Sequence, residues 1–141
     1  MSNSSTQPSS QADGRDYPTG ANRGHVLVLE PDPLTQWSLK TYLRRWFTVD
    51  GTSSVASAQR VLETHPVDAL VISEELSSTG LAYVEQCARS LNPRVAIVRT
   101  ISDPSKPSRP GTHLDCLEKP FELARLARLL GVPESELPPE P

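Results

Sequence analysis

The chain has 141 residues, with 14 Lys and Arg against 17 Asp and Glu, which gives a formal net charge of −3. This length is typical of one domain with tails, and an acidic balance without a basic stripe argues against binding to nucleic acid. No apolar run approaches the roughly 20 residues that a membrane-spanning helix needs, and the first residues lack the regions of a signal peptide. We therefore expect a cytoplasmic protein with no membrane segment.

Both ends of the chain are polar. Residues 1–23 contain Tyr17 as their only aromatic side chain, and residues 133–141 are acidic and rich in proline. Segments of this composition bury too little apolar surface to offset the entropy lost on ordering them. We predict a disordered tail at 1–23, one domain at 24–132 and a second disordered tail at 133–141.

Short apolar runs predict the strands of a sheet. The expected strands are 26–29, 47–50, 69–72, 95–98 and 114–117, with 47–50 at an edge. The run 69–72 is apolar at every position, which is typical of a strand buried on both faces of a parallel sheet. Open α/β sheets place ligands and chemistry at the carboxyl ends of their strands, so Ser73 stands at an informative position.

Helical patterns alternate with these strands. The expected helices run from Pro33 to about Trp46, from about Ser54 to His65, from about Gly80 to Leu91 with Leu81, Val84, Ala88 and Leu91 inward, and from about Phe121 to Leu130. Asp32 before Pro33 predicts the first helix start, since aspartate caps free N–H groups and proline suits the first helical position. Trp37 lies opposite the apolar stripe and is a candidate partner-binding residue.

Residues 101–112 carry three prolines at intervals of three, which predicts an extended loop and excludes an ordinary helix. The alternation of strands and helices elsewhere predicts a doubly wound α/β fold with a five-stranded parallel sheet. The two cysteines, Cys87 and Cys116, are expected as buried thiols and not as a disulfide.

Over about residues 25–132 the chain resembles the receiver domain of two-component response regulators. The resemblance rests on the order and spacing of VLVLEPDP, HPVDALVIS, Gly80-Leu81, VAIVRT and Glu118-Lys119-Pro120-Phe121. It implies a flavodoxin-like fold with strand order 2-1-3-4-5, in which the proline-rich loop replaces the fourth helix. It also implies a cis peptide bond between Lys119 and Pro120.

In that family an aspartate after the third strand accepts a phosphoryl group from a histidine kinase. Acidic residues after the first strand hold Mg²⁺, and a hydroxyl and a lysine contact the phosphoryl oxygens. The resemblance implies Glu30 as the first acid, Thr100 as the hydroxyl and Lys119 as the lysine. Pro31 stands in place of the second acid, and Ser73 in place of the phosphoacceptor.

The aromatic switch residue of the family, three positions before the lysine, is Cys116 in this chain. Serine has no ionised oxygen at neutral pH, so Ser73 does not replace the acceptor aspartate. With one acid lost, Glu30 and Asp32 are only weak metal ligands, and we predict no required cofactor and weakened binding of Mg²⁺.

The acidic residues after the third strand offer no better acceptor. Using Glu74 would shift the strand register by one residue and turn this side chain off the pocket. We therefore interpret Glu74 and Glu75 as part of a solvated loop. Lys119 is expected to pair with Glu30, with Asp32 nearby.

The leading hypothesis is a degenerate, non-enzymatic pseudo-receiver in a two-component or phosphorelay pathway. It would act through phosphorylation-independent contacts with a histidine kinase, a response regulator or an output protein. One alternative is a phosphorylatable receiver with an unusual acceptor. Another is a domain that binds a small anion at Ser73, Thr100 and Lys119. The sequence does not indicate an oligomeric state.

Overall fold

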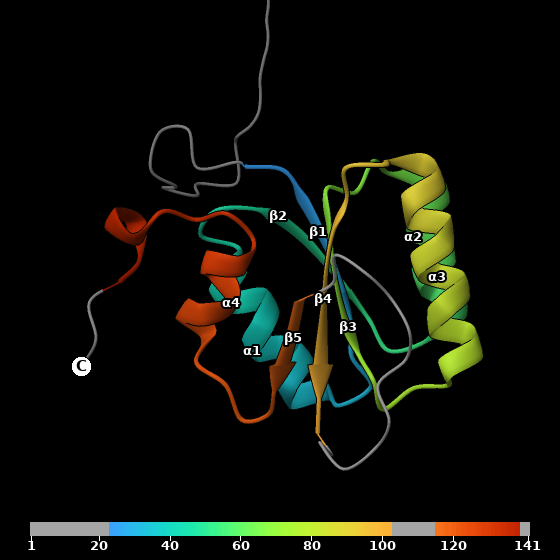
Figure 1. The fold of residues 1–141 in the computed structure, drawn as a ribbon, viewed down its shortest axis with the longest axis horizontal. Helices are drawn as coiled ribbons and strands as arrows, with labels where there is room; N and C mark the ends of the chain where they lie inside the picture. The colour runs from blue at the N-terminus through green and yellow to red at the C-terminus, as the bar shows by residue number, and fades with distance from the viewer. Residues whose placement is uncertain (1–22, 103–114, 139–141) are drawn as a thin grey trace, which may run out of the picture.

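The computed structural model describes residues 23–102 and 115–138. Five parallel strands form one sheet in the order β2-β1-β3-β4-β5 (Figure 1). The strands are β1 (His25–Leu29), β2 (Thr48–Thr52), β3 (Ala69–Ser73), β4 (Ala96–Ile101) and β5 (Asp115–Glu118). The helices are α1 (Pro33–Leu43), α2 (Val55–Thr64), α3 (Ser78–Leu91) and α4 (Leu123–Leu129), followed by a 3-10 turn (Glu134–Glu136). The predicted doubly wound fold and its strand order are confirmed.

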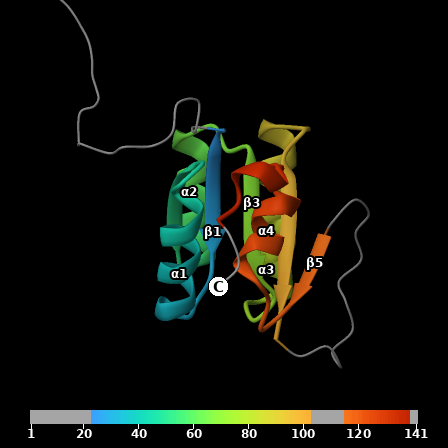
Figure 2. The ribbon, with the colours of Figure 1, turned by 90° about the vertical axis from the view of Figure 1, so that its left-hand side faces the viewer.

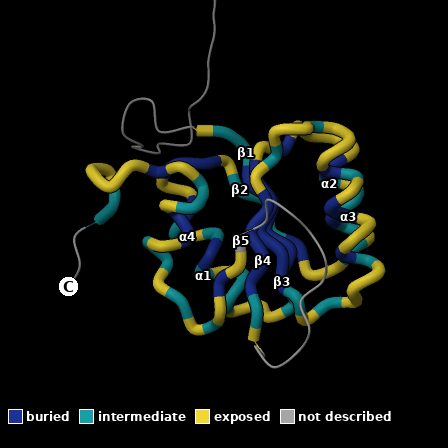
Figure 3. The backbone as a smooth tube through the Cα atoms, viewed as in Figure 1, coloured by how far each residue is buried: buried dark blue, intermediate teal, exposed yellow. Residues whose placement is uncertain are grey.

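The sheet separates two layers of helices, with α1 and α4 on one face and α2 and α3 on the other (Figures 1 and 2). Alternate residues of β3 therefore enter two different cores. Val71 packs with α1 and α4, whereas Leu70 and Ile72 pack with α2 and α3. All five positions of β3 are buried, as the sequence predicted for a strand covered on both sides (Figure 3).

Side-chain hydrogen bonds begin α1 and α2 where the sequence predicted these helices to start. The Asp32 carboxylate accepts the Thr35 N–H at 2.8 Å and caps α1. The Ser54 hydroxyl oxygen accepts the Ser57 N–H at 3.1 Å and caps α2. Gly131 follows α4 with φ +99°, a conformation that glycine adopts without strain.

Some predicted boundaries and burials are wrong. The helix α1 ends at Leu43, before the predicted Trp46, although Trp46 is still buried. The helix α3 begins at Ser78, before the predicted start, because the Ser77 hydroxyl accepts a backbone N–H and caps it earlier. Leu91 is 60% exposed rather than inward. At about 100° per residue, Leu91 lies within about 20° of the fully buried Val84 around the helix. Its exposure therefore follows from its place as the last residue of α3 and not from the helical period.

The prediction of two buried thiols is also wrong, since Cys87 is only partly buried and Cys116 is exposed. Cys116 lies on β5, which ends the described sheet and has β4 as its one strand neighbour there. An edge strand is covered by fewer neighbouring residues than a central strand, so the Cys116 thiol is exposed to solvent. Both cysteines are free.

Part of the predicted C-terminal tail lies against the domain. Leu137 packs on the α1–α4 core, and Glu134 and Glu136 pair with Arg128 and Arg23. Residues 133–138 are therefore not a detached tail, because a leucine among the acidic residues gives them an apolar anchor. Residues 1–22 and 139–141 of the predicted tails, and 103–112 of the proline-rich loop, lie outside the described residues. Among the described helices, none is long and apolar enough to cross a bilayer.

Candidate functional site

The predicted pocket lies at the carboxyl ends of the central strands. Parallel pairing places Leu29 beside Ile72, and Ser73 beside Thr100. Ser73 and Thr100 are each 1% exposed, so both hydroxyl groups lie inside the protein. The register therefore confirms that Ser73, and not Glu74, is the last residue of β3.

Lys119 follows β5 and is held in place by its own backbone. Its N–H donates to the Ile101 carbonyl at 2.7 Å, and its peptide bond with Pro120 is cis, as the resemblance implied. The ammonium group donates from Nζ to Glu30 Oε1 at 2.8 Å. Glu30 is 1% exposed, and a buried carboxylate is costly unless a cation compensates its charge. The predicted ion pair between Lys119 and Glu30 is present.

A second carboxylate, from Glu75, also binds Lys119. Glu75 Oε2 lies 2.9 Å from Nζ and accepts a hydrogen bond from the Ser102 hydroxyl. The backbone N–H of Glu75 donates to Ser73 Oγ at 3.3 Å, which turns the loop back over the end of β3. This turn directs Glu75 toward Lys119. Glu75 lies on an exposed loop as expected, but the interpretation as a solvated loop missed its contact with Lys119.

Asp32 lies at the edge of the pocket and serves α1. Its carboxylate accepts both the N–H and the hydroxyl of Thr35, at 2.8 and 2.6 Å. The hydrogen bond from the Thr35 hydroxyl is the largest cause that lowers the pKa of Asp32, and Lys119 adds a weaker attraction at longer range. The backbone N–H of Asp32 donates to Glu30 Oε2 at 3.0 Å, which helps to fix that buried carboxylate.

The contacts around Lys119 also shift pKa values. The pKa of Glu75 is lowered, first by the hydrogen bond from Ser102 and then by that from Lys119. Burial lowers the pKa of Lys119, but the hydrogen bonds to Glu30 and Glu75 and the attraction of their charges outweigh it, so this pKa is raised. Glu75 and Lys119 are therefore both charged at neutral pH.

The acids near Lys119 do not fit a magnesium ion in this arrangement. Lys119 occupies the position beside Glu30 that a cation would take, and the Asp32 carboxylate is turned toward Thr35. Within residues 23–102 and 115–138, no three His, Cys, Asp or Glu side chains are arranged to hold a metal ion. The ammonium group of Lys119 therefore supplies the positive charge in this pocket.

A buried ion pair that we did not predict lies on the other face of the sheet. Arg99 of β4 donates from Nε and Nη2 to the two carboxylate oxygens of Glu85 on α3, each at 3.2 Å. Both residues are 3% exposed, and Glu74 Oε2 lies 3.6 Å from Arg99 Nε. Opposite charges at core positions of a strand and a neighbouring helix are a signal that could have predicted this pair.

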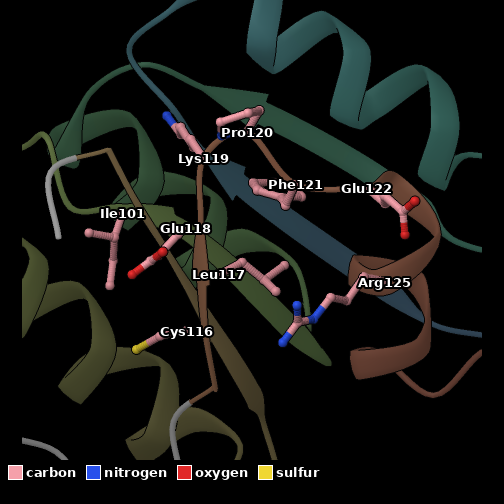
Figure 4. Close-up of a pocket in the computed structure, with 9 residues that line it drawn as sticks. All are labelled: Ile101, Cys116, Leu117, Glu118, Lys119, Pro120, Phe121, Glu122 and Arg125. Atoms are coloured by element: carbon pink, nitrogen blue, oxygen red, sulfur yellow. The ribbon is translucent and has the colours of Figure 1, made fainter.

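A depression of about 660 Å³ surrounds the edge strand (Figure 4). It is lined by Ile101, Cys116, Leu117, Glu118, Lys119, Pro120, Phe121, Glu122 and Arg125. Cys116, the predicted switch position, and Glu118 point to one side of β5, and Leu117 points to the other. The depression borders Lys119 but not Ser73 or Thr100, so it belongs to the sheet edge and not to the centre of the pocket.

Trp37 lies apart from the pocket on the outer face of α1. It is 62% exposed, as the sequence predicted, and Leu34, one turn earlier, is 70% exposed. Two large apolar side chains one turn apart on a helix form a continuous apolar area. We call Leu34 and Trp37 the α1 patch.

No family model matches the chain, and no curated protein matches it. Several solved structures do. A receiver domain described as CheY-like from Methylobacillus flagellatus is 26% identical, with a TM-score of 0.64 over 76% of this chain and 95% of that one. The receiver domain of a sensor histidine kinase from Pseudomonas aeruginosa, which holds a magnesium ion in its active site cleft, is 24% identical, with a TM-score of 0.64 over 75% and 93%.

A response regulator receiver protein from Sinorhizobium medicae is 23% identical, with a TM-score of 0.63 over 75% of this chain and 93% of that one. The described sheet and helices therefore have the CheY-like, flavodoxin-like fold, and the chain's structural neighbours are response regulator receiver domains.

Replacing Lys119 with Met removes the ammonium group but keeps an unbranched apolar side chain. We expect the free energy of unfolding, measured by urea denaturation, to fall by about 3 kcal/mol, because buried Glu30 loses its cation. Arg128→Met is the matched control. It breaks a pair with Glu134 in which both side chains are at least 40% exposed, and we expect a loss of at most about 1 kcal/mol. Equal losses in the two variants would contradict a special role of Lys119.

The lowered pKa of Glu75 predicts a pH-dependent contribution to stability. Its ionised form stabilises the folded state fully above the ordinary pKa of about 4.3, and this contribution is lost as the pH falls through the lower pKa of the folded state. The stability difference between the wild type and Glu75→Gln should be constant from neutral pH down to about pH 5 and shrink below about pH 4. Urea midpoints across this range measure it. Exposed Glu63, replaced by Gln, is the control, and a difference that does not change with pH would count against the ion pair.

Proposed function

We propose that the chain is a receiver-like, non-enzymatic signalling module that acts through protein contacts and without phosphoryl transfer. The observation that carries the proposal is the pairing of Lys119 with Glu30 and Glu75, because the lysine expected to meet a phosphoryl group is already bound. The likeness to receiver domains supports a place in two-component signalling. A histidine kinase, a response regulator or an output protein is the partner class that this implies.

The environment of Ser73 supports the same proposal. Its hydroxyl oxygen accepts the backbone N–H of Glu75, and no described residue that could act as a base is hydrogen-bonded to it. A neutral hydroxyl needs an adjacent base to become a nucleophile. A side chain that is 1% exposed is also poorly placed to meet a phosphodonor.

A receiver with an unusual acceptor is the second candidate, because the Glu75 carboxylate lies in the pocket beside Lys119. Its accepting oxygen is engaged by Lys119 and Ser102, and the acids nearby do not fit the metal ion that phosphoryl transfer would use. Binding of a small anion is less well supported. One ammonium group stands among the carboxylates of Glu30, Asp32 and Glu75, so the local charge is negative.

Incubation with acetyl phosphate and Mg²⁺, followed by intact-mass measurement, tests the absence of phosphoryl transfer. We expect no mass increase on the wild-type chain, under conditions that phosphorylate a receiver domain with an intact acceptor aspartate. An adduct of one phosphoryl group would overturn the proposal. If it is lost in Glu75→Gln but kept in Ser73→Ala, the second candidate is correct.

The α1 patch is the surface that we propose for partner contacts. Exposed apolar side chains that lie next to each other are typical of binding sites, and tryptophan is enriched among the residues that contribute most to binding. The exposed arginines of α4, Arg125 and Arg128, offer a second, charged surface.

Affinity capture from the native host tests the two surfaces, with the purified chain as bait. We expect Trp37→Ala to reduce recovery of the partner at least about tenfold, the loss of a binding contact worth over 1 kcal/mol. Tyr83→Ala is the matched control, because it removes a 56% exposed aromatic side chain from α3. Recovery that is unchanged by Trp37→Ala and by charge reversal at Arg125 and Arg128 would contradict both surfaces.

A further inference from the structure

Glu75 makes two contacts that an external oxyanion would be expected to make in this pocket. One carboxylate oxygen accepts a hydrogen bond from the Lys119 ammonium group at 2.9 Å and another from the Ser102 hydroxyl. An ammonium group and a hydroxyl that converge on one oxygen are a common arrangement for binding carboxylates and phosphates. Here the oxygen comes from the chain itself.

The two carboxylates that bind the Lys119 ammonium group differ in how readily another solute could replace them. Glu30 is 1% exposed and is fixed by the Asp32 N–H as well as by Lys119. The side chain of Glu75 is 41% exposed, lies on a loop, and could be exchanged for a solute without opening the core. Glu30 is therefore a fixed part of the pocket, whereas Glu75 occupies the position beside Lys119 and Ser102 that an external ligand would occupy.

The contact of Glu75 also joins the ends of β3 and β5, two strands that do not pair with each other in the sheet. It links the loop after β3 to Ser102 after β4 and to Lys119 after β5. On the other side, the neighbouring Glu74 lies 3.6 Å from Arg99. Successive glutamates of this loop thus lie beside different cations, Glu74 near Arg99 and Glu75 on Lys119.

We propose that Glu75 is a built-in oxyanion, which binds Lys119 and Ser102 in place of an external ligand and keeps the loop after β3 in one conformation. This inference rests on the proposed function and deepens it, since it supplies the reason why the module needs no phosphoryl group. An intramolecular carboxylate holds the loop, so the conformation of the loop does not depend on phosphorylation or on ligand binding at this pocket.

Chemical rescue tests the inference. Glu75→Ala removes the carboxylate and leaves room for a small one, and acetate is the probe, compared with chloride at equal concentration. The readout is hydrogen exchange at the amides of residues 75 and 76, which donate to the hydroxyl and the carbonyl of Ser73. Glu63→Ala, which removes an exposed glutamate from α2, is the matched control.

We expect these two amides to exchange at least about tenfold faster in Glu75→Ala than in the wild type, as expected when a local structure opens more easily. Acetate should restore slow exchange in this variant, whereas chloride should not, and neither salt should change the wild type or Glu63→Ala. Unchanged exchange in Glu75→Ala would show that the carboxylate does not hold the loop. Fast exchange that acetate slows no better than chloride would overturn its role as an oxyanion.

These results are independent of phosphoryl transfer. A phosphoryl adduct on the wild-type chain would remove the proposed function, whatever the exchange rates are. A chain that gains no phosphoryl group but fails the acetate test keeps the proposed function and loses only the built-in oxyanion.

Discussion

The buried charge of Glu30 is the constraint on which this end of the molecule depends. A carboxylate that is 1% exposed needs a cation, and Lys119 supplies it at 2.8 Å. Because β1 and β5 are separated in the sheet by β3 and β4, this ion pair spans most of its carboxyl edge. Lys119 therefore has a structural role, the compensation of the buried Glu30 charge, that does not require a phosphoryl group.

The loop after β3 completes the arrangement. Glu75 reaches Lys119, and Glu74 lies near Arg99, which is bound by Glu85 in the core beneath α3. Each lysine or arginine in these contacts thus meets more than one carboxylate. Both cations are therefore already bound by carboxylates of the chain, which supports the proposal of a module that acts without a phosphoryl group.

The central strands could be predicted from the sequence, because they are short apolar runs buried on both faces of the sheet, whereas the strand order was implied by the resemblance to receiver domains. The start of α1 was also predictable, since Asp32 and Pro33 act within one helical turn. Loops offer no such periodic pattern. The direction of Glu75 depends on a turn that closes on Ser73, and the exposure of Cys116 depends on its place at the sheet edge. The pair of Arg99 and Glu85 has a sequence signal in its opposite charges at core positions, but the contact itself depends on how α3 packs on the sheet.

A crystal structure of the chain with Mg²⁺ and beryllium trifluoride, an analogue of a phosphoryl group, tests the central claim most directly. The account predicts that Lys119 still binds Glu30 and Glu75, and that no metal ion or fluoride adduct lies beside Ser73. A metal ion on Glu30 with Lys119 displaced, or an adduct on the Glu75 carboxylate, would contradict it.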